Sequence, residues 1–255
     1  MEHDVVRLAN IADEVAPHIS TKAAALMLFG SAARGDASPT SDVDVLELLP
    51  SPAAVRRLGR VHIYGYSRNQ LRHLAVSGSL FVLHLKREGV IIADPLGDLA
   101  RCLDAYVTPA DYLGHRRALV ATANLLCTSR EDYGRNWRIY NDIAIFALRT
   151  ALYIRSAETG SPTFSLTRLA QSEKHTHLAS ALTLKTSPRE DFEAYSAAVA
   201  NIERAMDVQL SNSFGTIEAL IVNHGLEFPS LLAFGLRLVG APCESFGYDV
   251  ISPVP

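Results

Sequence analysis

Cysteine is scarce in this sequence. The 255 residues include three cysteines, Cys102, Cys127 and Cys243, which are odd in number and far apart along the chain. Their spacing matches neither a disulfide framework nor a metal-binding motif, and such sparse thiols are typical of a reducing compartment. We therefore expect a cytoplasmic protein without structural disulfides.

Long apolar runs are missing as well, and a secretory leader is not expected. No run of apolar residues approaches the ~18 that a membrane-spanning helix needs. The first four residues, MEHD, are acidic, unlike the start of a secretory signal peptide. Both features predict a protein that makes no use of a membrane.

Neither sign of charge dominates. The chain has 24 Lys and Arg against 27 Asp and Glu, a net charge of -3. Residues 1–107 hold 11 basic and 12 acidic side chains, and residues 108–255 hold 13 and 15. Strong non-specific binding of nucleic acid needs a basic surface. The charge therefore does not imply a nucleic-acid partner, although it does not exclude one.

The most informative stretch is LFGSAARGDASPTSDVDVL, residues 28–46. Apolar residues predict a buried strand before Gly30-Ser31 and a second one that carries Asp42 and Asp44. Side chains alternate along a strand, so the two aspartates should face the same way. Adjacent carboxylates repel each other unless a cation neutralises them, and Mg²⁺ prefers such oxygen ligands together with substrate phosphates. We expect Mg²⁺ here, with Mn²⁺ as the alternative.

The Gly30-Ser31 turn predicts the phosphate side of the same site. Glycine lets the backbone pass close to a ligand. The amides that follow, together with the Ser31 hydroxyl, can bind a phosphate where a short helix begins. The stretch thus indicates binding of a phosphate-bearing ligand together with a divalent cation.

This stretch resembles the signature of the nucleotidyltransferase superfamily related to DNA polymerase beta, in which Gly-Ser is followed by about ten residues and then by Asp, apolar, Asp, apolar. Here ten residues separate Gly30-Ser31 from Asp42-Val43-Asp44-Val45. Arg34-Gly35 and the serine before the first aspartate also match the small bacterial members. The resemblance implies that Asp42 and Asp44 bind metal and are catalytic, and that nucleotide is bound by Gly30, Ser31, Arg34 and Ser41.

The resembled family also places a third carboxylate on the next strand, facing the first two. The matching strand here, predicted at residues 60–66, carries His62 instead. Three explanations remain open. His62 acts as a catalytic base or weak ligand; a carboxylate such as Glu47, Asp94 or one in the second half replaces it; or the chain binds nucleotide with poor turnover.

The remaining pattern predicts two domains. Residues 1–107 read as an α/β (α+β) nucleotidyltransferase-type domain with a small mixed sheet, and residues 108–255 as an all-α helical domain. The second resembles the helical domains attached to many small nucleotidyltransferases, such as the antibiotic-modifying ones. A helix from Ser67 to about Arg87 should bend or split at Gly78, and Arg138 should pair with Asp142 four residues on. The expected strands cover residues 23–29, 42–49, 60–66 and 90–93, and the clearest later helices cover 109–128, 131–156 and 188–206, with weaker ones at 214–223 and 229–238.

Two functions fit these observations. The first is a metal-dependent nucleotidyltransferase that moves a nucleoside monophosphate from a triphosphate to a hydroxyl of a small molecule, a protein or an RNA end, and releases pyrophosphate. The alternative is a catalytically weak nucleotide-binding or antitoxin-like module that acts through a protein partner. The missing third carboxylate is the feature that separates them.

Overall fold

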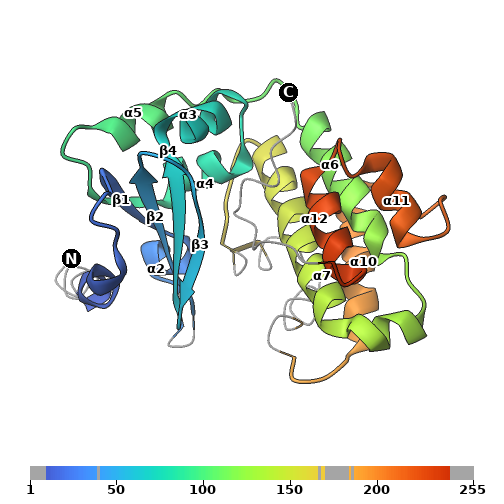
Figure 1. The fold of residues 1–255 in the computed structure, drawn as a ribbon. Coiled ribbons are helices and arrows are strands. Elements are labelled where there is room, and N and C mark those ends of the chain that lie inside the picture. The colour runs from blue at the N-terminus through green and yellow to red at the C-terminus, as the bar shows by residue number, and fades with distance from the viewer. Residues whose placement is uncertain (1–9, 39–40, 166–167, 170–183, 185–186, 242–255) are drawn as a thin grey trace. The chain divides into compact units, whose positions relative to one another are not determined.

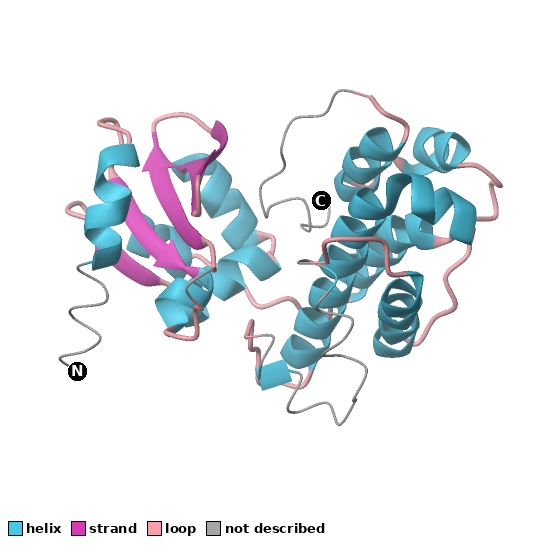
Figure 2. Cartoon of the chain, turned by 90° about the horizontal axis from the view of Figure 1, so that it is seen from below, coloured by secondary structure: helices cyan, strands magenta, loops and turns pink. Residues whose placement is uncertain are grey.

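The computed structural model describes residues 10–38, 41–165, 168–169, 184 and 187–241. Contacts divide the chain between Pro109 and Ala110, two residues after the boundary expected from the sequence. The first unit is a sheet with helices, and the second is built from helices (Figures 1 and 2). This confirms the predicted fold class, a small mixed sheet followed by a helical region.

The sheet of the first unit has five strands in the order β3-β4-β2-β1-β5. Antiparallel pairs join β1 to β2 and β5, and β3 to β4, whereas β2 and β4 run parallel. Four strands lie where the apolar pattern predicts them, but β3 was not predicted, because it is an edge strand with mostly exposed side chains. The strands are β1 (Ala25–Phe29), β2 (Val43–Leu49), β3 (Ala53–Leu58), β4 (Val61–Ser67) and β5 (Val90–Ala93).

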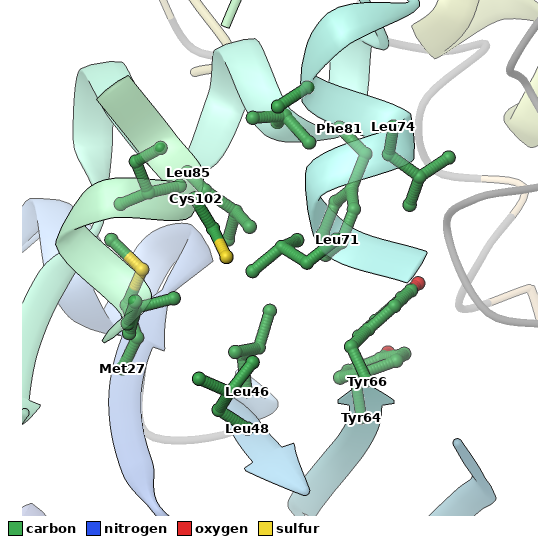
Figure 3. Close-up of a cluster of buried hydrophobic side chains, with 14 of the residues drawn as sticks. Met27, Leu46, Leu48, Tyr64, Tyr66, Leu71, Leu74, Phe81, Leu85 and Cys102 are labelled. Carbon is green, nitrogen blue, oxygen red and sulfur yellow. The ribbon is translucent and has the colours of Figure 1, made fainter. Parts of the chain in front are cut away.

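Alternation along the central strands gives the sheet two apolar faces. On one face, Leu46 and Leu48 of β2 and Tyr64 and Tyr66 of β4 pack against α3 (Arg68–Val76), α4 (Leu80–Glu88) and α5 (Asp98–Asp104) (Figure 3). On the other face, the core comprises Ile11, Val15, Leu28, Ala32, Ala33, Val43, Val45, Val61 and Ile63, which come from the helical residues 10–15, from α2 (Gly30–Arg34) and from the strands. Burial of both faces leaves the ends of the central strands as the place where their polar groups can face solvent.

The long helix expected from Ser67 to about Arg87 is split in two at Gly78. Gly78 has φ of +72°, and a Cβ there would lie 2.5 Å from Cγ of Pro109. Each half has its own serine cap, since Ser67 Oγ accepts from the Gln70 amide and Ser79 Oγ from the Phe81 amide, both at 3.2 Å. The break turns the chain so that α3 and α4 both cover the same face of the sheet.

In the helical unit, α7 (Arg130–Glu158) packs against α10 (Phe192–Met206). Tyr133 and Tyr195 meet with ring centroids 4.5 Å apart, and the Tyr195 hydroxyl donates to the Leu126 carbonyl at 2.6 Å. No helix in the described part combines the length and apolar character that a bilayer crossing requires. The other described helices of this unit are α6 (Leu113–Ala123), the 3-10 turn η2 (Asn124–Leu126), α11 (Ile217–His224) and α12 (Pro229–Leu238).

One ion pair expected from helical spacing is wrong. Asp142 pairs with Arg237 of α12 at 2.6 Å rather than with Arg138. The Arg138 guanidinium lies over the ring of Trp137, 4.9 Å from its centroid. A partner 95 residues away in sequence is supplied by tertiary packing, which the local pattern does not encode.

His115 of α6 is a buried titratable group, only 2% exposed, with its ring 5.4 Å from that of Tyr112. Burial lowers the pKa of His115 from its ordinary 6.5 to about 4, because an imidazolium would lose its hydration inside the unit. The folded unit therefore holds His115 neutral at pH values where the unfolded chain protonates it.

We expect this unit to lose stability as the pH falls from about 6.5 to 4, since the unfolded chain gains a proton that the folded unit excludes. A pKa lowered this far corresponds to a loss of about 3 kcal/mol in the free energy of unfolding. Denaturant unfolding followed by fluorescence of Trp137, the single tryptophan, measures it. His115→Phe should flatten the pH dependence, whereas the control His224→Gln, at a half-exposed histidine, should keep the parent slope. An unchanged slope in His115→Phe would contradict the assignment.

Candidate active site

Asp42, Asp44 and His62 converge at one end of the central strands. The parallel register of β2 and β4 places Asp44 beside His62. The His62 Nδ1 lies 3.9 Å from Asp44 Oδ1, and its Nε2 lies 3.9 Å from Asp42 Oδ1. These separations exceed a hydrogen bond but place both carboxylates next to the imidazole. The side chains are 32%, 13% and 17% exposed for Asp42, Asp44 and His62, so a ligand can reach all three.

Tyr64 orients one of these carboxylates, and the sequence analysis did not identify it. Its hydroxyl donates to Asp44 Oδ1 at 3.3 Å. Tyr64 follows His62 by two residues on β4, so the alternation that places His62 on this face places Tyr64 there too. That alternation was the available signal.

Gly30 lies directly against Asp44. Its φ is +71°, and a Cβ at this position would stand 2.7 Å from Asp44 Oδ2, too close for any real contact. Glycine is therefore needed both for the left-handed backbone and for the space beside the carboxylate. The next side chain, Ser31, is half-buried, and its hydroxyl has no hydrogen-bond partner among the residues that the structure describes.

Two residues expected to bind nucleotide are held by other contacts. Arg34 Nη1 donates to Glu88 Oε2 at 2.9 Å, and Arg34 Nε donates to Asp36 at 3.1 Å. Although burial acts against its charge, the hydrogen bond to Asp36 and the nearby Glu88 raise the pKa of Arg34. Ser41 Oγ lies 2.9 Å from Ser38 Oγ and accepts from the Ser38 amide. Nucleotide binding by Arg34 or Ser41 would require these bonds to be exchanged.

Neither named stand-in for the third carboxylate lies with the two aspartates. Glu47 points to the opposite face, is fully buried, and accepts from the Ser20 amide at 2.6 Å and from Arg56 Nη2 at 2.8 Å. Asp94 follows β5 at the other end of the sheet, where its Oδ2 accepts from the Ala100 amide at 2.9 Å. Both carboxylates serve the fold, and the position beside Asp44 on β4 is occupied by His62.

The donor set suits a cation that arrives with its substrate. The described residues contain no group of three or more His, Cys, Asp or Glu that could hold a metal ion unaided. Asp42 and Asp44 nevertheless offer carboxylate oxygens on one face, and Gly30 keeps the space beside Asp44 clear. Mg²⁺ commonly uses one or two carboxylates and completes its octahedron with phosphates and water. The residues therefore fit a divalent cation in the presence of a triphosphate.

A protein-family model described as a nucleotidyltransferase domain matches residues 9–84, a range that includes every residue of this site. Residues 9–84 form a nucleotidyltransferase domain. This confirms the resemblance carried by Gly30-Ser31 and Asp42-Val43-Asp44. The match ends within α4, so it does not extend to the helical unit.

Comparison with solved structures finds a nucleotidyltransferase-like protein from Exiguobacterium sibiricum 255-15 at 16% sequence identity, with 90% of this chain and 89% of that chain covered. The TM-score is 0.31, too low for this likeness to bear on the geometry of the site. Comparison with curated proteins gives no match.

Replacing Gly30 by alanine tests the close approach to Asp44. We expect Gly30→Ala to displace the Asp44 carboxylate and to weaken Mg²⁺-dependent triphosphate binding by roughly 10–100-fold, the range for a disturbed metal ligand. Calorimetry measures the affinity. Gly59→Ala is the matched control, because Gly59 also has positive φ (+63°) but nothing lies within 4 Å of its Cβ position. Equal affinities in the two variants would show that the space beside Asp44 is not needed.

Proposed function

We propose that this protein is a metal-dependent nucleotidyltransferase that moves a nucleoside monophosphate from a nucleoside triphosphate to an acceptor hydroxyl. The acceptor oxygen forms a bond to the α-phosphorus, the bond from that phosphorus to the β-phosphate oxygen breaks, and pyrophosphate leaves. The convergence of Asp42, Asp44 and His62 beside Gly30, within a nucleotidyltransferase domain, is the observation that supports this proposal.

Each side chain then has a role. Asp42 and Asp44 hold the divalent cation, Mg²⁺ or Mn²⁺, which when bound neutralises the phosphates and favours attack on phosphorus. Tyr64 fixes the orientation of Asp44 through its hydrogen bond. The Ser31 hydroxyl donates to a phosphate oxygen beside the Gly30 turn. His62 accepts the proton of the acceptor hydroxyl as the new bond forms.

In the alternative function, the protein binds the nucleotide but does not catalyse transfer of the nucleoside monophosphate. An imidazole in place of the third carboxylate favours a module that binds a triphosphate and acts through a protein partner, as an antitoxin-like protein would. Nucleotide binding without any labelled product, after incubation with labelled triphosphates, Mg²⁺ and cell extract, would support this alternative over the transferase.

Triphosphate binding should depend on Mg²⁺ and on the aspartate pair. We expect calorimetry to show tighter binding with Mg²⁺ than without it. Asp42→Asn or Asp44→Asn should weaken the Mg²⁺-dependent binding by roughly tenfold or more, because each removes a charged ligand. Without metal, both variants should be at least as stable as the parent, since a repulsion between like charges is relieved. Asp13→Asn, at an exposed aspartate, is the control. Equal binding with and without Mg²⁺ would rule out the metal site.

His62 is tested by two substitutions with opposite outcomes. His62→Ala should lower turnover by roughly 10²–10⁴-fold, the usual contribution of a general base. His62→Asp should retain or raise activity, because it restores the carboxylate that the resembled family has on this strand. Steady-state kinetics at saturating Mg²⁺ measure both. If both variants match the parent, His62 takes no part and the base lies elsewhere.

A further inference from the structure

Four residues form a row across the sheet. Asp44 on β2 lies between Phe29 on β1 and His62 on β4, and Arg57 on β3 pairs with His62 on the other side. Residues that pair directly in a sheet share a face. From β1 to the edge strand β3, the row therefore consists of a phenyl ring, a carboxylate, an imidazole and a guanidinium group.

The contacts of the neighbouring residues fix the face on which Arg57 lies. Arg56 reaches the reverse face, where its Nη2 donates to buried Glu47 at 2.8 Å. Val55 packs against the core cluster on the Tyr64 face. Side chains alternate along β3, so Arg57 shares the face of Val55, Asp44 and His62.

The Arg57 guanidinium has no ion pair or hydrogen bond with any described residue, and its side chain is exposed. Most arginines of this unit are engaged: Arg34 with Asp36 and Glu88, Arg56 with Glu47, Arg60 with Glu14, and Arg68 and Arg101 with Asp98. Arg72 and Arg87 also lack such pairs, but they lie on helices and not in this row. Among the described residues of the five strands, Arg57 is thus the one arginine or lysine whose charged group has no partner.

Arg57 lies far from the Gly30-Ser31 turn, which we expect to bind the phosphates. Neighbouring strands are about 4.8 Å apart, so the Arg57 backbone lies roughly 10 Å from that of Asp44 and roughly 15 Å from that of Phe29, which precedes Gly30. A triphosphate at the Gly30 turn would therefore occupy one end of the row. Arg57 lies at the other end, beyond the His62 imidazole that would receive the proton of the acceptor.

We propose that Arg57 binds an oxyanion on the acceptor, so that the natural acceptor is an alcohol carrying a phosphate or carboxylate group near the reacting hydroxyl. This rests on the proposed function, which places the acceptor beside His62. A guanidinium offers paired N–H donors that match either oxyanion. A polycationic acceptor would be repelled at the same place.

Binding of three simple alcohols tests this. The full chain is saturated with Mg²⁺ and a non-hydrolysable α,β-methylene triphosphate, and is then titrated with glycerol 3-phosphate, glycerate or glycerol. Calorimetry gives the affinities, and the Nε–Hε NMR signal of Arg57 reports contact directly. We expect both anions, but not glycerol, to bind and to shift this signal, and the stronger anion identifies the natural group.

Variants of exposed arginines complete the test. Arg57→Gln should weaken anion binding on the order of tenfold or more, the value of a charge-assisted hydrogen bond. Arg57→Lys should recover part of the affinity. Arg72→Gln, which removes an exposed arginine on α3, should bind like the parent. Thermal unfolding checks that each variant folds.

The outcomes separate this inference from the proposed function. Failure of the triphosphate analogue to bind overturns the proposed function, and the same anions are then titrated against the nucleotide-free chain. Anion binding that is equal in the parent and in Arg57→Gln overturns the inference. So does a parent that binds all three alcohols alike, or none. Arg57 would then serve only to keep the edge strand from pairing with another chain.

Discussion

The parallel pairing of β2 with β4 is the constraint on which the sheet unit depends. One register places Leu46 beside Tyr64 and Leu48 beside Tyr66 in the core, and places Asp44 beside His62 at the end of the strands. Because side chains alternate with a period of two, a slip of one residue would turn the whole set of either strand to the other face. The packing energy of the core therefore also holds the polar groups of the site in place.

Charges on the two faces of β2 have different surroundings. On the reverse face, Glu47 is fully enclosed and has both oxygens bonded, as a buried carboxylate must. On the site face, Asp42 and Asp44 remain partly open to solvent and lie beside the His62 imidazole and the Tyr64 phenol. Repulsion within this pair is tolerable only at a surface, where a cation can reach it. The same strand thus separates an acid that serves the fold from two acids that a ligand can reach.

The sequence predicts the parts of this unit that depend on local pattern. Apolar alternation gave the positions of β1, β2, β4 and β5, and the glycine–serine turn with its two aspartates indicated the family. Strand β3 was not predicted because an edge strand with exposed side chains lacks an apolar pattern. It forms by pairing with β4. The Arg34–Glu88 and Arg237–Asp142 ion pairs were not predicted, because the two residues of each pair are 54 and 95 positions apart in the sequence. Such contacts exist only once the chain has packed.

The Glu47–Arg56 pair has a consequence for how the family could diversify. This ion pair attaches β3 to the reverse face of the sheet. The next residue, Arg57, is exposed and adds nothing to the core. Substitutions at that outward position carry almost no folding penalty. A lineage of such proteins could therefore change the chemistry that its edge strand offers by single substitutions, while Asp42, Asp44 and the hydrophobic layer beneath them stay the same.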